Sequence, residues 1–359
     1  MSNFITRYKK QRHAQCLSDF MPVVLISLVI LIFGFSLIRF YYNLTTPNVT
    51  LQGKSSAYLY IPTHSDFESV KYTLVRQNYL HNLKSFDWAS NRMQYGKHIM
   101  PGKYRVYDGM SNRQLIQILR SGIQEPVKLI LTGARNEKDL AGKVGHLLEP
   151  DSAKFMRLFH DSSFLLQFGV KPATVLTLFI PDTYEFYWNT SAASFIKRMV
   201  RERQRFWHGR RLKTCDSIGF SNTEVYILAS IIEKETVRSD EKPVIAGVYI
   251  NRIKRHIPLQ ADPTIIFAWN DYRIKRVLNN HLKINSPFNT YKYAGLPPGP
   301  ICIPSISSID AVLRYQRHRF LYFCANEDFS GYHRFSSTLA EHNRNARKYQ
   351  EALDKLKIK

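Results

Sequence analysis

The stretch that decides the fold of the second half of this chain is SNTEVYILASIIEKET, residues 221–236. Ser221, followed three positions later by Glu224, forms a capping-box pattern, which predicts that a helix begins near residue 222. At about 100° per residue, the Val, Ile and Leu side chains that follow cover one broad arc of this helix. Glu235 falls within that apolar arc, whereas Glu233 falls outside it. Glu235 is therefore the unusual carboxylate.

An acidic side chain on a core-facing arc needs a physical explanation, because burying a charge is costly. Burial raises the pKa of a carboxyl group, and a glutamic acid that stays protonated near neutral pH can act as a general acid on a glycosidic bond. Two structural alternatives stay open here: Glu235 pairs with a buried Arg or Lys, or the helix ends before it. For Glu233 the simpler expectation is a solvated residue on the outer helix face.

Three polar or rigid segments follow this helix. They are LQADPT (259–264), SPFNTY (286–291) and GLPPGPI (295–301). We expect the first two to be extended, so that Gln260 and Asp262 share one side of the chain, as do Asn289 and Tyr291. Each segment also has an ordinary structural reading as a cap or turn. Together, and after one buried glutamate, they favour a groove for a hydroxyl-rich ligand.

The chain upstream predicts a small α+β module at residues 57–125. Its pattern is strand, helix, strand, helix, with YLYIP and GKYRVYDG as strands. Capping sequences at Ser65 and Ser111 begin the helices, and Gly122 ends the second one. Residues 126–359 then form a larger mixed domain that starts with a strand, VKLILTG, and ends in a basic helical tail. The expected fold class is α+β.

An uncharged run, MPVVLISLVILIFGFSLI, occupies residues 21–38. As a helix it rises roughly 27 Å, close to the hydrocarbon thickness of a bilayer. We predict a retained single-pass anchor at residues 21–42, joined by a polar connector at 43–56 to the rest of the chain. The basic residues of the tail at 1–20 place the N-terminus in the cytoplasm, and the bulk of the chain outside the inner membrane.

The charge and the cysteines limit the class of partner. A net charge of +23 indicates an anionic partner, and export makes nucleic acid an improbable one. Three of the four cysteines lie beyond the anchor without CxxC spacing, and a disulfide between Cys302 and Cys324 is one option. His333 and His342 are nine residues apart, without a metal-binding spacing. We therefore expect neither a metal nor a cofactor.

These motifs resemble the endolytic murein transglycosylase family, also called YceG-like. The resemblance is carried, in family order, by ASIIEKET, NRI (251–253), LQADPT, SPFNTY, GLPPGPI, YFCAN (322–326), and the ending with His333, Phe335, His342 and Asn343. PDTY (181–184) matches upstream, and residues 99–122 resemble the LysM-like module of the family. With the anchor, the resemblance covers most of the chain.

The resemblance implies an activity and its residues. Glu235 matches the catalytic glutamate, and the substrate-binding candidates are Glu233, Gln260, Asp262, Thr264, Asn289 and Tyr291. The substrate would be the peptidoglycan glycan strand, cut between N-acetylmuramic acid and N-acetylglucosamine with a 1,6-anhydro product. Cutting would end the growth of new strands near the membrane, in the company of peptidoglycan synthases such as penicillin-binding proteins.

One departure from the family and two other functions stay in view. The family has Glu-Gly shortly before PDTY, where this chain has Leu176 and Thr177, so the role of that acid is open unless Glu185 replaces it. A non-catalytic wall-binding scaffold is one alternative, which retention of the motifs disfavours. The other is a hydrolytic muramidase, for which Asp262 is the candidate second carboxylate.

Overall fold

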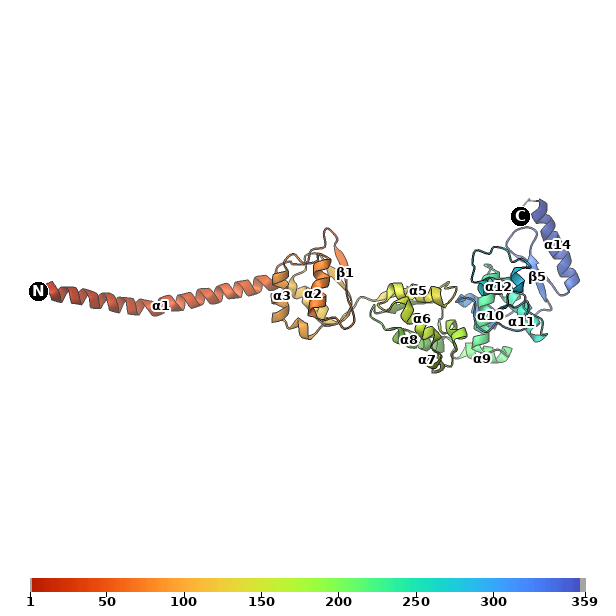
Figure 1. The fold of residues 1–359 in the computed structure, drawn as a ribbon, viewed down its shortest axis with the longest axis horizontal. Helices are drawn as coiled ribbons and strands as arrows, with labels where there is room; N and C mark the ends of the chain where they lie inside the picture. The colour runs from red at the N-terminus through yellow and green to blue at the C-terminus, as the bar shows by residue number, and fades with distance from the viewer. Residues whose placement is uncertain (1, 356–359) are drawn as a thin grey trace. The chain divides into compact units, whose positions relative to one another are not determined.

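A computed structural model describes the backbone of residues 2–355 and the side chains of residues 21–355, so the side chains of the predicted cytoplasmic tail lie outside the described residues. The chain divides into two compact units, Met1–Pro126 and Val127–Lys359. Both mix helices with antiparallel strand pairs, β1 with β2, β3 with β4 and β5 with β6 (Figure 1). The α+β class predicted from the sequence is confirmed at this level.

The first helix is longer than the sequence predicted. α1 spans Ser2–Thr45, and its part from Met21 to Thr45 is long and apolar enough to cross a membrane, with none of the most apolar window buried. The segment expected as a polar connector at 43–56 belongs instead to the first unit. Val49 and Leu51 lie in its core, and the backbone carbonyl of Asn43 accepts a hydrogen bond from Asn112.

The first unit contains one helix that the sequence reading missed. Its elements are β1 (Ser56–Ile61), α2 (Phe67–Arg76), α3 (Leu83–Arg92), a 3-10 turn η1 (Tyr95–Lys97), β2 (Gly102–Tyr107) and α4 (Asn112–Ser121). The unpredicted helix is α3, which is capped by Asn82. Asp66, rather than Ser65, caps α2. The capping box of Ser111 and the left-handed glycine at 122 are found as predicted.

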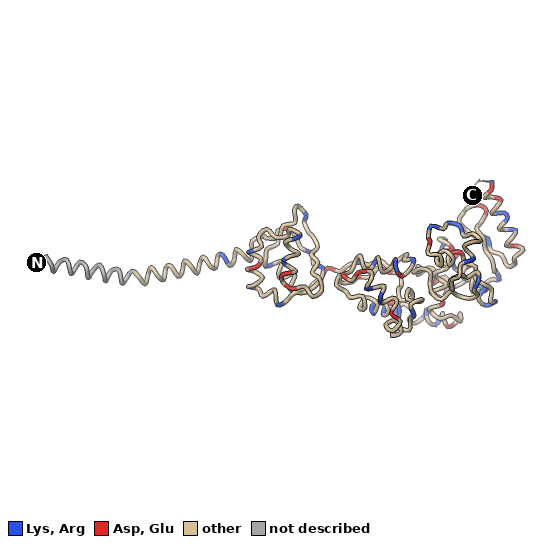
Figure 2. The backbone as a smooth tube through the Cα atoms, in the orientation of Figure 1, with Lys and Arg blue, Asp and Glu red and all other residues tan. Residues whose placement is uncertain are grey.

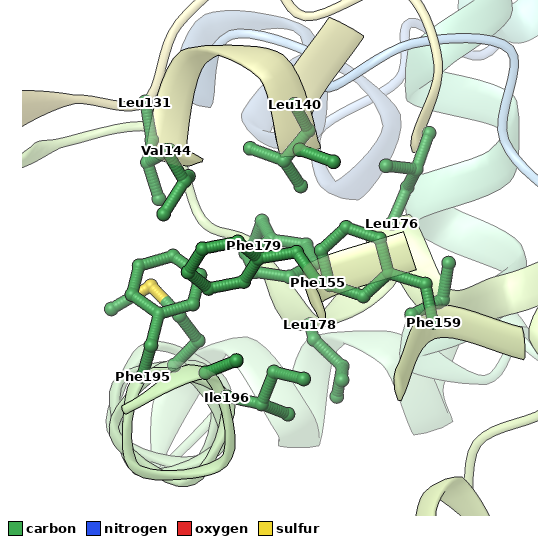
Figure 3. Close-up of a cluster of buried hydrophobic side chains, with 14 of the residues drawn as sticks. Leu131, Leu140, Val144, Phe155, Phe159, Leu176, Leu178, Phe179, Phe195 and Ile196 are labelled. Atoms are coloured by element: carbon green, nitrogen blue, oxygen red, sulfur yellow. The ribbon is translucent and has the colours of Figure 1, made fainter. Parts of the chain in front are cut away.

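The first half of the second unit packs around phenylalanine side chains. Its elements are β3 (Val127–Ile130), α5 (Glu137–Leu147), α6 (Ser152–His160), α7 (Ser162–Leu166), η2 (Pro172–Leu178), β4 (Thr183–Phe186) and α8 (Ala192–Phe206). Figure 3 shows Phe155, Phe159, Phe179 and Phe195 gathered between α5 and α8. The antiparallel β3–β4 pair, in which Val127 faces Phe186, brings the start of this segment beside the strand that precedes α8.

The second half of this unit is built around α10. Its elements are α9 (Arg210–Ile218), α10 (Asn222–Glu235), α11 (Lys242–Lys254), α12 (Asp262–Trp269), η3 (His281–Lys283), α13 (Ile306–Leu313), β5 (Tyr322–Ala325), β6 (His333–Ser336) and α14 (Leu339–Lys355). Eight consecutive residues of α10, 225–232, are buried, because α11, α12, α13 and η2 pack around the helix. A helix that is apolar on every side is a core helix.

The charges and the cysteines complete this description. Lys and Arg occur in both units rather than in one block (Figure 2). Cys215, Cys302 and Cys324 are free thiols, so the disulfide considered between Cys302 and Cys324 is not formed. Cys302 is buried, and its thiol lies 3.4 Å from the carbonyl oxygen of Ser230 on α10.

Candidate active site

The core helix α10 brings Glu235 to the edge of a cavity. The helix begins at the predicted capping box, in which the Glu224 carboxylate accepts from the Ser221 backbone N–H at 2.7 Å. It ends at Glu235, and Thr236 continues in an extended conformation. The buried middle of the helix therefore fixes the position of a carboxylate in its last turn.

The surroundings of Glu235 favour its protonated form. The Tyr249 hydroxyl donates a hydrogen bond to Oε1 of Glu235 at 2.5 Å, and no described residue forms a hydrogen bond with Oε2. Burial, the largest effect, raises the pKa of Glu235, and the negative charge of Asp262 raises it further. The hydrogen bond from Tyr249 lowers the pKa, and the balance of the three effects is a pKa of about 7. Glu235 can thus hold a proton near neutral pH.

Glu235 lines two cavities. The first has a volume of about 370 Å³ and is lined mainly by polar and aromatic side chains: Glu235, Tyr249, Arg252, Leu259, Gln260, Asp262, Tyr291, Tyr322, Phe323 and His342. The second has a volume of about 340 Å³ and is lined by Glu235, Thr236, Val237, Ala325, Asn326, Phe329, Gly331, Tyr332, His333 and Tyr349. Glu235 is the one lining residue that the two cavities share.

Gln260 and Asp262 both line the first cavity, although not for the predicted reason. The segment is not extended: Gln260 has a left-handed backbone (φ 54°), and Asp262 is the first residue of α12. The Tyr291 hydroxyl donates to Asp262 at 2.5 Å, which ties the SPFNTY loop to the start of α12. Three of the substrate-binding candidates, Gln260, Asp262 and Tyr291, are thereby brought together beside Glu235.

Thr264 and Asn289 lie behind the cavity wall and do not line it. Thr264 is fully buried, and its hydroxyl lies 2.8 Å from that of Thr290. The Asn289 amide donates to the carbonyls of Leu282 and Ile284, so it holds the loop that carries Tyr291. We assign both residues to the support of the site rather than to contact with a ligand.

Glu233 is neither a solvated residue nor a cavity residue. Its Oε2 accepts hydrogen bonds from the hydroxyls of Ser305 and Ser308, and from the Lys242 ammonium at 3.0 Å. Burial raises the pKa of Glu233, but these hydrogen bonds together outweigh it and leave the pKa lowered. Glu233 therefore joins α10 to the starts of α11 and α13.

Several cavity residues were not assigned from the sequence, although all but Tyr249 lie in motifs quoted above. These are Tyr249, Arg252, Tyr322, Phe323 and His342. Arg252 is buried and donates to the carbonyls of Pro258 and Leu321 and to Gln260, which fixes the loop against β5. The His342 ring stacks on Tyr322 at 5.4 Å, and burial together with the Arg252 charge lowers the pKa of His342.

The remaining candidate positions lie away from this cavity. Leu176 and Thr177 are buried in η2, and Glu185 is exposed on β4. None of these three residues lines either cavity. Gly299 of the GLPPGPI segment packs so closely that a Cβ there would lie 1.8 Å from the carbonyl oxygen of Ala173. Within residues 21–355, no three His, Cys, Asp or Glu side chains gather as ligands for a metal ion.

Comparison with known proteins identifies the family. The YceG-like family matches residues 59–348. A protein from Bacillus subtilis named endolytic murein transglycosylase is 27% identical over 317 residues, which cover 84% of this chain and 87% of that protein. A protein of the same name from Streptococcus pneumoniae is 26% identical, over 79% of this chain but only 57% of its own length.

A solved structure agrees with this assignment. The crystal structure of a YceG-like protein from Listeria monocytogenes superposes with a TM-score of 0.55 at 26% identity, over 81% of this chain and 99% of that one. The sequence match and the structural match thus cover most of the chain. The chain belongs to the YceG-like family of endolytic murein transglycosylases.

Proposed function

We propose that this chain cuts the glycan strand of peptidoglycan between N-acetylmuramic acid and N-acetylglucosamine, with Glu235 as general acid and then general base. The observation that carries the proposal is that Glu235, whose carboxyl group has a raised pKa, lines two neighbouring cavities. A polysaccharide that occupies both cavities presents one glycosidic bond to Glu235. The names of the relatives supply the substrate class.

In the first step, Glu235 gives its proton to the bridging oxygen. Because Oε1 accepts the Tyr249 hydrogen bond, the proton sits on Oε2, which has no hydrogen-bond partner among the described residues. Transfer of this proton breaks the glycosidic bond and leaves an oxocarbenium-like centre at C1 of the muramoyl residue. The nearby Asp262 carboxylate, held by Tyr291, stabilises that positive charge.

In the second step, the Glu235 carboxylate takes the proton of the muramoyl C6 hydroxyl. The C6 oxygen then bonds to C1, which closes the 1,6-anhydro ring and restores protonated Glu235. Atoms balance without water, because the substrate supplies its own nucleophile. One acid/base group is therefore sufficient, whereas hydrolases usually use two carboxylates across the bond.

The apolar helix supports a further part of the proposal. We assign residues 21–42 to a single-pass anchor in the inner membrane, with the first unit and the second unit outside the cytoplasm. A tethered enzyme acts on strands near the bilayer, where synthases release them. We propose that its cuts end the growth of new strands, and that the first unit, as a LysM-like module, binds glycan.

The test is the release of soluble fragments from purified glycan strands. Glu235→Gln should lower the rate by roughly 100- to 10,000-fold, because it removes the general acid. Glu185→Gln is the matched control, since it makes the same change at an exposed position of the same unit. Equal loss in both variants, or full activity in Glu235→Gln, would contradict the proposal. Binding without cleavage by the wild type would favour the scaffold alternative.

A further inference from the structure

The anchor helix α1 is packed onto the first unit by its last turns. Leu44 packs against the core of that unit, and the Asn43 carbonyl accepts a hydrogen bond from Asn112 at 2.8 Å. One turn earlier, the ring of Phe40 meets the indole of Trp88 on α3 edge to face, at 5.5 Å between centroids. The guanidinium of Arg92, also on α3, lies over the same Phe40 ring at 5.7 Å.

These contacts fix the depth of Trp88 relative to a bilayer that α1 crosses. The uncharged run ends at Ile38, and Phe40 lies two residues, roughly 3 Å, beyond it along the helix. The headgroup layer on each side of the hydrocarbon core is roughly 5–8 Å thick. Phe40 and the indole that touches it therefore lie at the level of the lipid headgroups.

The polar groups of Trp88 and Arg92 are available to bind lipid headgroups. Trp88 is 36% exposed, and its indole N–H donates to no described residue. Arg92 is exposed and makes no ion pair or hydrogen bond in the described part of the chain, and the same holds for Arg39 on α1. Tryptophan gathers at membrane interfaces because its ring is apolar and its N–H is polar, and a guanidinium binds phosphate with two parallel hydrogen bonds.

We propose that Phe40, Trp88 and Arg92 form an interfacial patch that seats the first unit among phospholipid headgroups, with Arg92 and Arg39 binding lipid phosphate. The inference rests on the anchor assigned under the proposed function. It adds a second membrane contact, made by a folded unit rather than by the anchor itself. The first unit is then held against the bilayer surface instead of moving freely at the end of a tether.

The experiment measures tryptophan fluorescence of the full chain in lipid nanodiscs. Nitroxide-labelled lipids serve as quenchers, labelled either at the headgroup or deep in the acyl chain. The headgroup label should quench the share of emission that comes from Trp88, one of four tryptophans, and the deep label should not. Trp88→Phe, which keeps an aromatic ring against Phe40, should lose this quenching. Trp269→Phe, at a 46% exposed position in the second unit, is the matched control and should retain it.

The possible results distinguish a failure of the interfacial patch from a failure of the membrane anchor. Equal headgroup quenching in the wild type and Trp88→Phe would overturn the interfacial patch. The patch would also be overturned if acrylamide in the water quenched Trp88 and the headgroup label did not. Trp88→Tyr repeats the test if the Phe variant does not fold. A chain that does not enter nanodiscs at all would overturn both the anchor and the patch. The proposed glycan cleavage is tested by a separate assay, and neither quenching result bears on it.

Discussion

At the scale of single residues, the chemistry of the site depends on how burial and two neighbours set the proton affinity of Glu235. Burial raises the pKa of this carboxyl group to about 7, the Tyr249 hydrogen bond lowers it, and the Asp262 charge raises it. The Tyr249 hydroxyl also orients the group by occupying Oε1. An acid that is half protonated near neutral pH can both give and accept a proton in one catalytic cycle.

Tyr249→Phe and Asp262→Asn should move the pH profile of cleavage in opposite directions. The acid step needs protonated Glu235, so kcat/KM should fall as the pH rises through about 7. Removing the Tyr249 hydroxyl raises the pKa of Glu235 and moves this limb to higher pH, whereas removing the Asp262 charge moves it to lower pH. Shifts of the same sign, or none, in pH profiles of the two variants would contradict this assignment.

Glu235→Gln should stabilise the second unit at alkaline pH. The pKa of Glu235 is raised from 4.5 to about 7 in the fold, so the folded state binds more protons between these values, and stability falls as the pH rises through them. The full penalty, about 3 kcal/mol, is present above pH 7 and absent below pH 4.5. Denaturant unfolding of wild type and variant at pH 4.5 and pH 8 measures it. A stability difference that does not change with pH would exclude a buried Glu235.

The sequence identified Glu235 because a carboxylate stood out among apolar side chains. Tyr249 was missed because a tyrosine on an apolar helix face looks like an ordinary core residue, and its contact crosses the turn between two helices. Thr264 and Asn289, predicted as ligand-binding candidates, lie outside the lining of both cavities. Polar residues that support a loop and polar residues that face a ligand look alike in sequence, and only the fold distinguishes them.

At the scale of helices, the ion pair of Glu233 and Lys242 holds α10 against its neighbours. Glu233→Ala should destabilise the second unit by roughly 2–4 kcal/mol, because it leaves the Lys242 ammonium, only 7% exposed, without its carboxylate. Denaturant unfolding measures this loss. Glu233→Ala combined with Lys242→Met should cost less than the sum of the single variants. Additive losses would show that the two side chains are not coupled.

Helix starts that carry a capping box were predicted more reliably than short strands and loops. The capping signals at Ser111 and Ser221 were confirmed because they act within one turn of chain. Strand β4 and strand β6 were missed, since each has only four residues and exists through its partner. LQADPT was wrong as an extended segment, because Arg252 holds Gln260 in a left-handed turn before α12.

At the scale of the whole molecule, we expect the anchor to control where cutting occurs but not its chemistry. A chain in which a cleavable signal replaces residues 1–42 should cleave isolated strands at the wild-type rate, while cells carrying it should make longer strands. Residues from Asn43 onward must be kept, because Asn43 and Leu44 contact the first unit. Strand lengths in the cells are measured by chromatography, and unchanged lengths would contradict a role for the anchor.

If Glu235 cleaves glycan without water as a reactant, the ends of the product strands contain no oxygen from the solvent. Purified strands are digested by the full chain in water enriched in the heavy oxygen isotope, and the fragments are analysed by mass spectrometry. We expect 1,6-anhydromuramoyl ends that carry no heavy oxygen, and we expect Glu235→Gln to produce no such ends. Reducing ends that contain the heavy isotope would contradict it and would make the chain a hydrolase.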